Sequence, residues 1–340
     1  MTELEKANAE MEPMMSHAES LLQSATVCDM LFGYLTNAQE EIQPFVTAGF
    51  GFVSITVGGD DNAWPTLIFQ RLARERQFYG NCPDQFILVD TVEDIRRAKR
   101  EWKLAISFHF QGTEAIGRDL SLVGAYYKLG VRWMLLAYNF QNNVGVGCIE
   151  AQSRDLGLSD FGKQLIAEMN RIGMIVDLSH TGLRTTLEAI EASNAPCIFS
   201  HSNADALNSH PRNITDDQIR AVAETGGIIG VNGVGSFMNE PRKVKAESVF
   251  KHIDYIVQLV GIKHVALGLD YMSPACCDHV YTLLKGDLSR VGMMEPPWAF
   301  FHPKQIMELT ELMVRAGYND DHIHDVLGEN FIRIASDVWR

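Results

Sequence analysis

The chain has 340 residues, of which 46% are hydrophobic and 21% are charged, and its formal net charge is −14. This is ordinary globular composition, ample for a large core. The acidic balance and the absence of a lysine and arginine cluster argue against binding to nucleic acid. We expect a small-molecule substrate as the partner.

The N-terminal stretch and the cysteines indicate the compartment. Residues 1–22 are acidic and helical in pattern, without the charged and apolar regions of a signal peptide. No apolar run reaches the length of a membrane span, so we expect no membrane partner. The six cysteines lack CxxC spacing, and Cys28 and Cys197 lie in apolar runs typical of a core. This usage fits a reducing cytoplasm.

The first half of the chain alternates between helical and strand-like patterns. The strands are short apolar runs, and the strongest of them closes on Gly58-Gly59-Asp60-Asp61. The predicted helices are 3–23, 37–47, 63–79, 91–103 and 113–129. The predicted strands are 25–31, 50–57, 104–110 and 132–138, and 86–89 is a short strand or an extended piece. A long polar loop, 139–158, follows the last of these strands, and long loops at strand ends commonly carry function.

The second half continues the same alternation. The predicted helices are 160–172, 215–224 and 246–260, one helix-length segment before residue 197, and three segments that close the chain. The predicted strands are 174–178, 197–200, 226–231 and 264–269. Thr215 is a plausible N-cap. Residues 271–303 read as an irregular stretch.

Strands separated by helices predict a parallel α/β architecture. About eight strands favour a closed (β/α)8 TIM barrel over an open doubly wound sheet, which would need a GxGxxG motif after an early strand. We expect a single barrel domain over residues 1–340, with an N-terminal helical extension and C-terminal helices.

Two histidines mark a candidate site. His180 and His201 each follow an apolar strand, and one helix-length segment separates the two strands. The carboxyl ends of parallel strands in one βαβ unit lie on the same face, where barrel sites are built. The alternative is a pair of capping or core histidines, but two on adjacent strands favour a functional site.

Asp270 ends a third strand on the same face. Two imidazoles and a carboxylate suit a divalent metal such as zinc with an open position for water. Alternatively, the aspartate is the general base that takes a proton from that water. Both alternatives predict hydrolysis at a polarised carbonyl, whereas a turn or N-cap aspartate would carry no chemistry.

Other polar residues have two interpretations each. Arg212, in the sequence HPRN, either binds a substrate carboxylate bidentately or satisfies structural carbonyls. His109 shares a strand face with Gln111 and is more often a barrel-layer residue than a ligand. Asn139 and Asn142, like Gln141, either bind amides or build turns.

Several motifs together resemble the membrane (renal) dipeptidase family, peptidase family M19. They are DLSH at 177–180, SHSNADALNSHPRN at 200–213 and GGIIGVN at 226–232, with LGVRWMLLAYN at 129–139 and VLGENFIRI at 326–334. The resemblance runs from about residue 91 to the C-terminus, with a fainter part before it. It implies a (β/α)8 barrel of the amidohydrolase superfamily, usually with two zinc ions and often dimeric. A homodimer or higher homo-oligomer is therefore expected.

The departures from the family pattern concern the metal site. Family members end the first strand with Asp-Gly-His-x-Asp; here Asp29 matches the leading aspartate, but Leu31 and Gly33 replace the two ligands. The Glu-Gly pair of the bridging glutamate appears as Gln111-Gly112. The substrate-contacting histidine before an asparagine appears as Tyr138, so Tyr138 and Asn139 are expected to contact the substrate.

His180, His201, Asp270 and Arg212 match family positions. The resemblance therefore implies Asp270, His180 and His201 as catalytic residues, with Arg212 as a substrate-binding residue. We expect at most one zinc or other divalent ion, on His180 and His201 with Asp270 or Gln111 nearby, and no two-metal centre.

Three functions stay open at this point. The leading hypothesis is a dipeptidase-like hydrolase of a small amide or peptide-like substrate. A non-hydrolytic lyase or decarboxylase on the same fold is the second, and a catalytically silent small-molecule-binding protein is the third. Lost metal ligands favour the third hypothesis, and the matched residues favour the first two.

Overall fold

Eight parallel strands form the centre of the molecule in the computed structural model, which describes residues 16–33, 41–60, 64–150, 152–283, 287–288, 293 and 295–340. In order around the sheet they are β1 (Cys28–Phe32), β2 (Phe52–Gly59), β4 (Leu104–Gln111), β5 (Val131–Leu135), β6 (Ile175–Asp177), β7 (Ile198–Phe199), β8 (Ile228–Val231) and β9 (Val265–Leu267). The N–H of Asp270, just after β9, donates to the carbonyl of Leu31 in β1 at 3.0 Å. This bond brings the last strand back to the first and confirms the predicted (β/α)8 barrel.

A ninth strand, β3 (Phe86–Leu88), lies beside the barrel order. It pairs with the first half of β4, where Leu88 is opposite Ile106. β5 takes the same edge of β4 further along, from Phe108 onward. The same edge of β4 therefore pairs first with β3 and then with β5.

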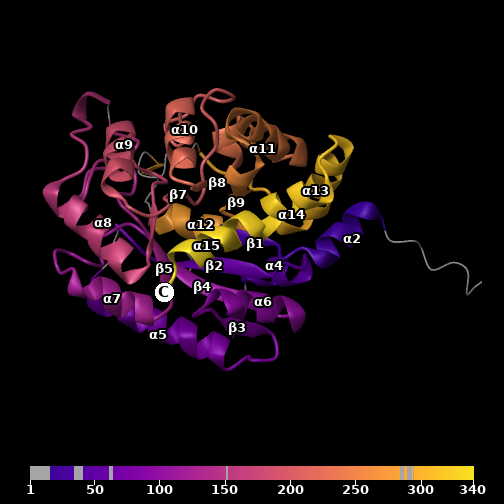
Figure 1. The fold of residues 1–340 in the computed structure, drawn as a ribbon, viewed down its shortest axis with the longest axis horizontal. Coiled ribbons are helices and arrows are strands. Elements are labelled where there is room, and N and C mark those ends of the chain that lie inside the picture. The colour runs from indigo at the N-terminus through magenta and orange to yellow at the C-terminus, as the bar shows by residue number, and fades with distance from the viewer. Residues whose placement is uncertain are drawn as a thin grey trace, which may run out of the picture.

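Helices surround the strands (Figure 1). They are α2 (His17–Ser24), α4 (Gln43–Thr47), α5 (Pro65–Gly80), α6 (Val92–Arg100), α7 (Ser121–Lys128), α8 (Asp160–Ile172), α9 (Leu183–Ala192), α10 (Asp216–Glu224), α11 (Ala246–Val260), α12 (Pro274–Leu283), α13 (Ile306–Arg315), α14 (Asp320–His324) and α15 (Asn330–Val338). Their sequences explain their starts: Thr215, the predicted N-cap, accepts a hydrogen bond from the Gln218 N–H at 3.3 Å and closes a capping box.

The strands are buried along almost their whole length because helices cover the outside and side chains fill the inside. Within the barrel, the ring of Phe52 lies 4.7 Å from Phe331 and 6.5 Å from Trp133. Cys28 and Cys197 are buried as predicted, and all six cysteines are free. The interior is thus a packed core, and open chemistry is confined to the strand ends.

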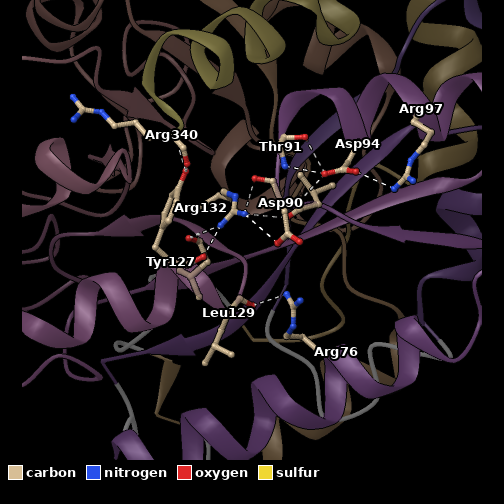
Figure 2. Close-up of polar contacts among 11 residues, drawn as sticks. Arg76, Asp90, Thr91, Asp94, Arg97, Tyr127, Leu129, Arg132 and Arg340 are labelled. Carbon is tan, nitrogen blue, oxygen red and sulfur yellow. Dashed lines mark hydrogen bonds and ion pairs between the residues drawn. The ribbon is translucent and has the colours of Figure 1, made fainter.

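A buried arginine near the start of β5 binds several segments of the chain, and Figure 2 shows its polar contacts. The Arg132 guanidinium, from β5, donates to the carbonyls of Tyr127 at 2.8 Å and Asp90 at 2.9 Å. It also lies 4.4 Å from the centre of the Tyr127 ring. The Tyr127 hydroxyl in turn donates to the Arg340 carbonyl at 3.1 Å. These contacts tie three separate segments together, and Arg132 therefore has a structural role.

Some expected boundaries were wrong. The helix expected over 113–129 begins only at Ser121, because the N–H groups of Thr113 and Glu114 donate to the Asp60 side chain instead of entering a helix. The stretch 271–303, expected to be irregular, contains α12. The expected helices 3–23, 37–47 and 63–79 lie partly outside the described residues. Among the described helices, none has both the length and the apolar character that a membrane span needs.

Candidate active site at the carboxyl ends of the strands

His180 and His201 lie side by side. His180 follows β6 and His201 follows β7, and their Nε2 atoms are 2.8 Å apart. Both side chains are buried, and burial together with the nearby Arg212 charge holds the pKa of each imidazole well below its usual value. The structure thus brings the two predicted histidines into direct contact as neutral rings.

The outer nitrogens of the two rings are also held. His201 Nδ1 lies 2.7 Å from Ser200 Oγ, and the Ser200 hydroxyl makes a short hydrogen bond to the Asp177 carboxylate. His180 Nδ1 lies 2.7 Å from Asn139 Oδ1. Short contacts on both sides of the ring pair thus fix the planes of the two rings.

The loop after β5 supplies a wall of the site. The Tyr138 ring stacks on His180 with centroids 4.1 Å apart and an interplanar angle of 25°. The Cys148 N–H donates to the His180 carbonyl at 2.7 Å, and its thiol donates to Asn139 Oδ1 at 3.4 Å. The predicted residues Tyr138 and Asn139 therefore both lie against His180.

Asp270 lies at the seam between β9 and β1. Its Oδ2 accepts a hydrogen bond from Asn232 Nδ2 at 3.2 Å. Burial raises its pKa to about 7, an effect that the Arg212 charge and the Asn232 bond oppose. A carboxylate that titrates near neutrality is suited to general base chemistry.

Arg212 is buried and lies close enough to Asp270 and both histidines to act on their ionisation. One of its terminal nitrogens donates to the His201 carbonyl at 3.1 Å. Its guanidinium lies 5.3 Å from the Phe237 ring centre, and its Nε has no hydrogen-bond partner among the described residues. The guanidinium thus contacts the His201 carbonyl, the Phe237 ring and the Cys148 side chain, and with five N–H groups it retains donor capacity for a ligand.

Backbone strain concentrates at the same residues. Five described residues other than glycine have a positive φ, and three of them are Asn139 at 61°, His180 at 65° and Asp270 at 54°. Left-handed backbone costs such residues about 1–3 kcal/mol and persists where the surrounding structure enforces it, often at functional sites. The strain supports the assignment of this rim as the site.

The opposite part of the rim, at β1 and β4, has a different character. Leu31 is fully buried, and an added Cβ at Gly33 would lie 3.0 Å from Met272. Asp29 accepts hydrogen bonds from the Leu31 and Leu269 N–H groups, while its second oxygen is buried without a partner among the described residues. Its pKa is raised to about 7, chiefly by burial.

Gln111 belongs to a hydrogen-bonded group inside the barrel. Its Nε2 donates to Thr56 Oγ1 at 2.9 Å, and the Thr56 hydroxyl donates to the Phe32 carbonyl at 3.0 Å. His109 Nε2, 2.8 Å from the same hydroxyl oxygen, must then be the donor. His109 also stacks on Trp133 at 5.2 Å, and burial lowers its pKa to about 3. It is a barrel-layer residue.

These residues supply part of the ligand set of a zinc site. Catalytic zinc normally takes three protein ligands. His180 and His201 supply two nitrogens, and the described residues contain no group of three His, Cys, Asp or Glu side chains placed to hold an ion.

Three further residues contribute to the site, although the sequence did not predict a role for them. Asn232 binds Asp270, and the pair Asp177 and Ser200 supports His201. All three lie at or next to strand ends, within motifs that also supplied the predicted residues. Position at a strand end was the signal that would have identified them.

A parallel barrel with paired imidazoles, a buried carboxylate and an arginine at its strand ends is the architecture of an amidohydrolase-type enzyme. The membrane dipeptidase family, peptidase family M19, matches residues 28–285. The chain belongs to this family, which confirms the resemblance seen in the motifs.

Individual relatives agree with this assignment. An uncharacterized dipeptidase of Schizosaccharomyces pombe is 37% identical over 259 residues, which are 74% of this chain and 56% of that protein. The chain thus matches little more than half the length of this relative. An amidohydrolase structure from Pseudomonas aeruginosa has a TM-score of 0.86 at 28% identity, covering 95% of this chain and 99% of that one.

A more distant structure shares the fold alone. The probable dipeptidase PvdM from Pseudomonas aeruginosa has a TM-score of 0.80 at 20% identity, covering 95% of this chain and 98% of that one.

Proposed function

We propose that this protein is a dipeptidase-like hydrolase that cleaves the amide bond of a small, carboxylate-bearing substrate. The observation that carries the proposal is the convergence of Arg212, Asp270 and the His180–His201 pair at one barrel rim in a member of the M19 family. Membership supports peptide-like chemistry, and the guanidinium supports an anionic substrate.

Asp270 is the proposed general base. Its carboxylate takes a proton from the water that attacks the substrate carbonyl carbon, and passes the proton to the amide nitrogen as the C–N bond breaks. A pKa of about 7 suits both transfers, because the group binds and releases a proton near neutral pH. Asn232 holds the carboxylate in place at 3.2 Å.

The remaining residues position the reactants. Arg212 binds the substrate carboxylate through its guanidinium N–H groups. The neutral imidazoles of His180 and His201, held by Asn139 and Ser200, form the wall beside which the substrate carbonyl is placed. Tyr138 and Asn139 form the side of the pocket next to His180.

The site takes at most one divalent ion in this proposal, with His180 and His201 as its side-chain ligands. The apolar Leu31, Gly33 and the neutral Gln111 supply no anionic ligand for a second ion. We further propose that the protein acts in the cytoplasm as a homo-oligomer, from the cysteine usage and the family resemblance.

The test is metal analysis of protein purified without chelator, followed by a panel of dipeptides and matched neutral amides. The proposal predicts hydrolysis of dipeptides, lost in the Asp270→Asn variant and retained in Asp119→Asn. Asp119 is the matched control because it is an exposed aspartate that only caps Ser121. Binding of dipeptides without turnover would favour the silent binding protein, which the altered β1 residues independently support.

A further inference from the structure

Asp60, directly after β2, accepts four hydrogen bonds from two other loops. Its Oδ1 receives the N–H groups of Thr113 at 2.7 Å and Glu114 at 3.2 Å, in the loop after β4. Its Oδ2 receives the Tyr138 N–H at 2.9 Å and Asn142 Nδ2 at 2.9 Å, in the loop after β5. One carboxylate therefore joins three consecutive strand ends.

The neighbouring residues are shaped around this carboxylate. Gly112 has a φ of 153°, and an added Cβ there would lie 2.2 Å from Asp60 Oδ1, so no larger residue fits. The Asn142 amide nitrogen also donates to Thr113 Oγ1 and to the Leu136 carbonyl, both at 2.9 Å. Its oxygen accepts from the Val144 N–H at 2.8 Å. Asn142 thus builds the loop, the second of the two roles considered for it.

We propose that Asp60 is a positioning residue: by holding the Tyr138 backbone, it sets the Tyr138 ring against His180 in the candidate site. The ring stacks on His180 at 4.1 Å, and its backbone N–H is bound to Asp60 at 2.9 Å. The consequence for turnover rests on the proposed function. The geometric claim does not, because it concerns only the placement of one ring.

A carboxylate is the group that satisfies this environment. All four partners are N–H donors, and an ionised carboxylate only accepts. Burial raises the pKa of Asp60 to about 6, and the hydrogen bonds from Tyr138, Thr113 and Asn142 act in the opposite direction. At neutral pH the group is therefore ionised. An asparagine would turn an N–H₂ group toward two of the donors in either orientation, so Asp60→Asn loses two bonds without a change in size.

The first test follows the His180 ring by NMR in protein labelled with ¹⁵N-histidine, with signals assigned by a His180→Asn variant. Asp60→Asn should shift the His180 ring signals in the same direction as Tyr138→Ala. The first variant moves the Tyr138 ring away from His180, and the second removes that ring. Asp119→Asn should leave these signals unchanged, since the Asp119 side chain bonds Ser121 at the start of α7. His264, bound to the Gly227 carbonyl, is the internal reference.

Asn142→Ala removes one of the four hydrogen bonds to Asp60. This variant replaces Asp60→Asn in the NMR test if Asp60→Asn does not fold. It should shift the His180 signals less than Tyr138→Ala does. Unshifted His180 signals in a folded Asp60→Asn or Asn142→Ala protein would overturn the proposal.

The second test is a double-mutant cycle on kcat/KM for a hydrolysed dipeptide. Asp60→Asn should lower kcat/KM by about 10- to 100-fold in the wild-type background, the scale expected of a misplaced group. In the Tyr138→Ala background the loss should be several-fold smaller, because the residue that Asp60 positions is gone. Equal losses in both backgrounds would contradict the proposal. If no dipeptide is hydrolysed by the wild type, the proposed function fails and the His180 signals alone decide the role of Asp60.

Discussion

The two halves of the barrel rim differ in chemistry although the same fold builds both. At β6 and β7, two imidazoles touch and are supported by Ser200 and Asn139. At β1 and β4, Leu31 is buried and Gln111 is bound to a barrel-layer hydroxyl. The comparison teaches that one barrel rim can carry a hydrogen-bonded polar half and a largely apolar half, because the side chains at each strand end decide the local chemistry.

The prediction with the largest expected effect concerns catalysis by Asp270 and the polar half of the rim. Asp270→Asn keeps the shape of the side chain and removes its basicity. We predict that kcat falls by about 10²–10⁴-fold while KM changes little, because general base catalysis is worth that much. Steady-state kinetics with the Asp119→Asn control measures the effect. Undiminished turnover in Asp270→Asn would show that another group is the base.

The second prediction concerns the anionic end of the substrate. Arg212→Lys keeps the charge but loses the planar pair of donors. We expect ligands with a carboxylate to bind about 10- to 100-fold more weakly, the range of one or two hydrogen bonds to a charged group. Neutral amide analogues, measured by calorimetry beside them, should be little affected. Equal weakening of both ligand classes would identify Arg212 as a structural residue that only supports the His201 carbonyl.

A third prediction tests the comparison of the two half-rims directly. The wild-type chain should bind no more than one zinc ion, and a Leu31→His, Gly33→Asp, Gln111→Glu variant should bind one more. The Gly33 substitution requires a small shift of the Met272 side chain, 3.0 Å from the added Cβ. The number of zinc ions bound per chain, measured by mass spectrometry for both proteins, tests this prediction. Two tightly bound ions in the wild-type chain would contradict the interpretation that the residues at β1 no longer bind a metal ion.

The last prediction concerns the stability of the fold at the seam between the halves, rather than the activity of the site. The pKa of Asp29 is raised from 3.8 to about 7, chiefly by burial. A raised carboxyl pKa contributes stability that is fully present below pH 3.8 and is lost as pH rises through about 7. Asp29→Asn should remove this part of the pH dependence, on the order of 4 kcal/mol between pH 4 and 8. Denaturant unfolding across that range measures it, and an unchanged slope would contradict the assignment.

The order of most elements could be predicted from the amino-acid sequence, although the start of α7 and the presence of α12 could not. Apolar runs of strand length, separated by helix-length segments, predicted the barrel, and period-two alternation placed His109 and Gln111 on one face. The rule that parallel strands end on one side placed His180, His201 and Asp270 at the same rim. These features follow from local patterns, which a sequence displays directly.

The atomic contacts of the site, by contrast, became visible in the folded structure. Asp60 bonds residues in two loops that follow other strands, Asp270 bonds Asn232 from the neighbouring strand end, and the two histidines meet through Nε2. These partners are far apart along the chain, and barrel closure with loop packing brings them together. Hydrogen bonds form over about 3 Å, a scale that residue spacing and hydrophobic periodicity do not resolve.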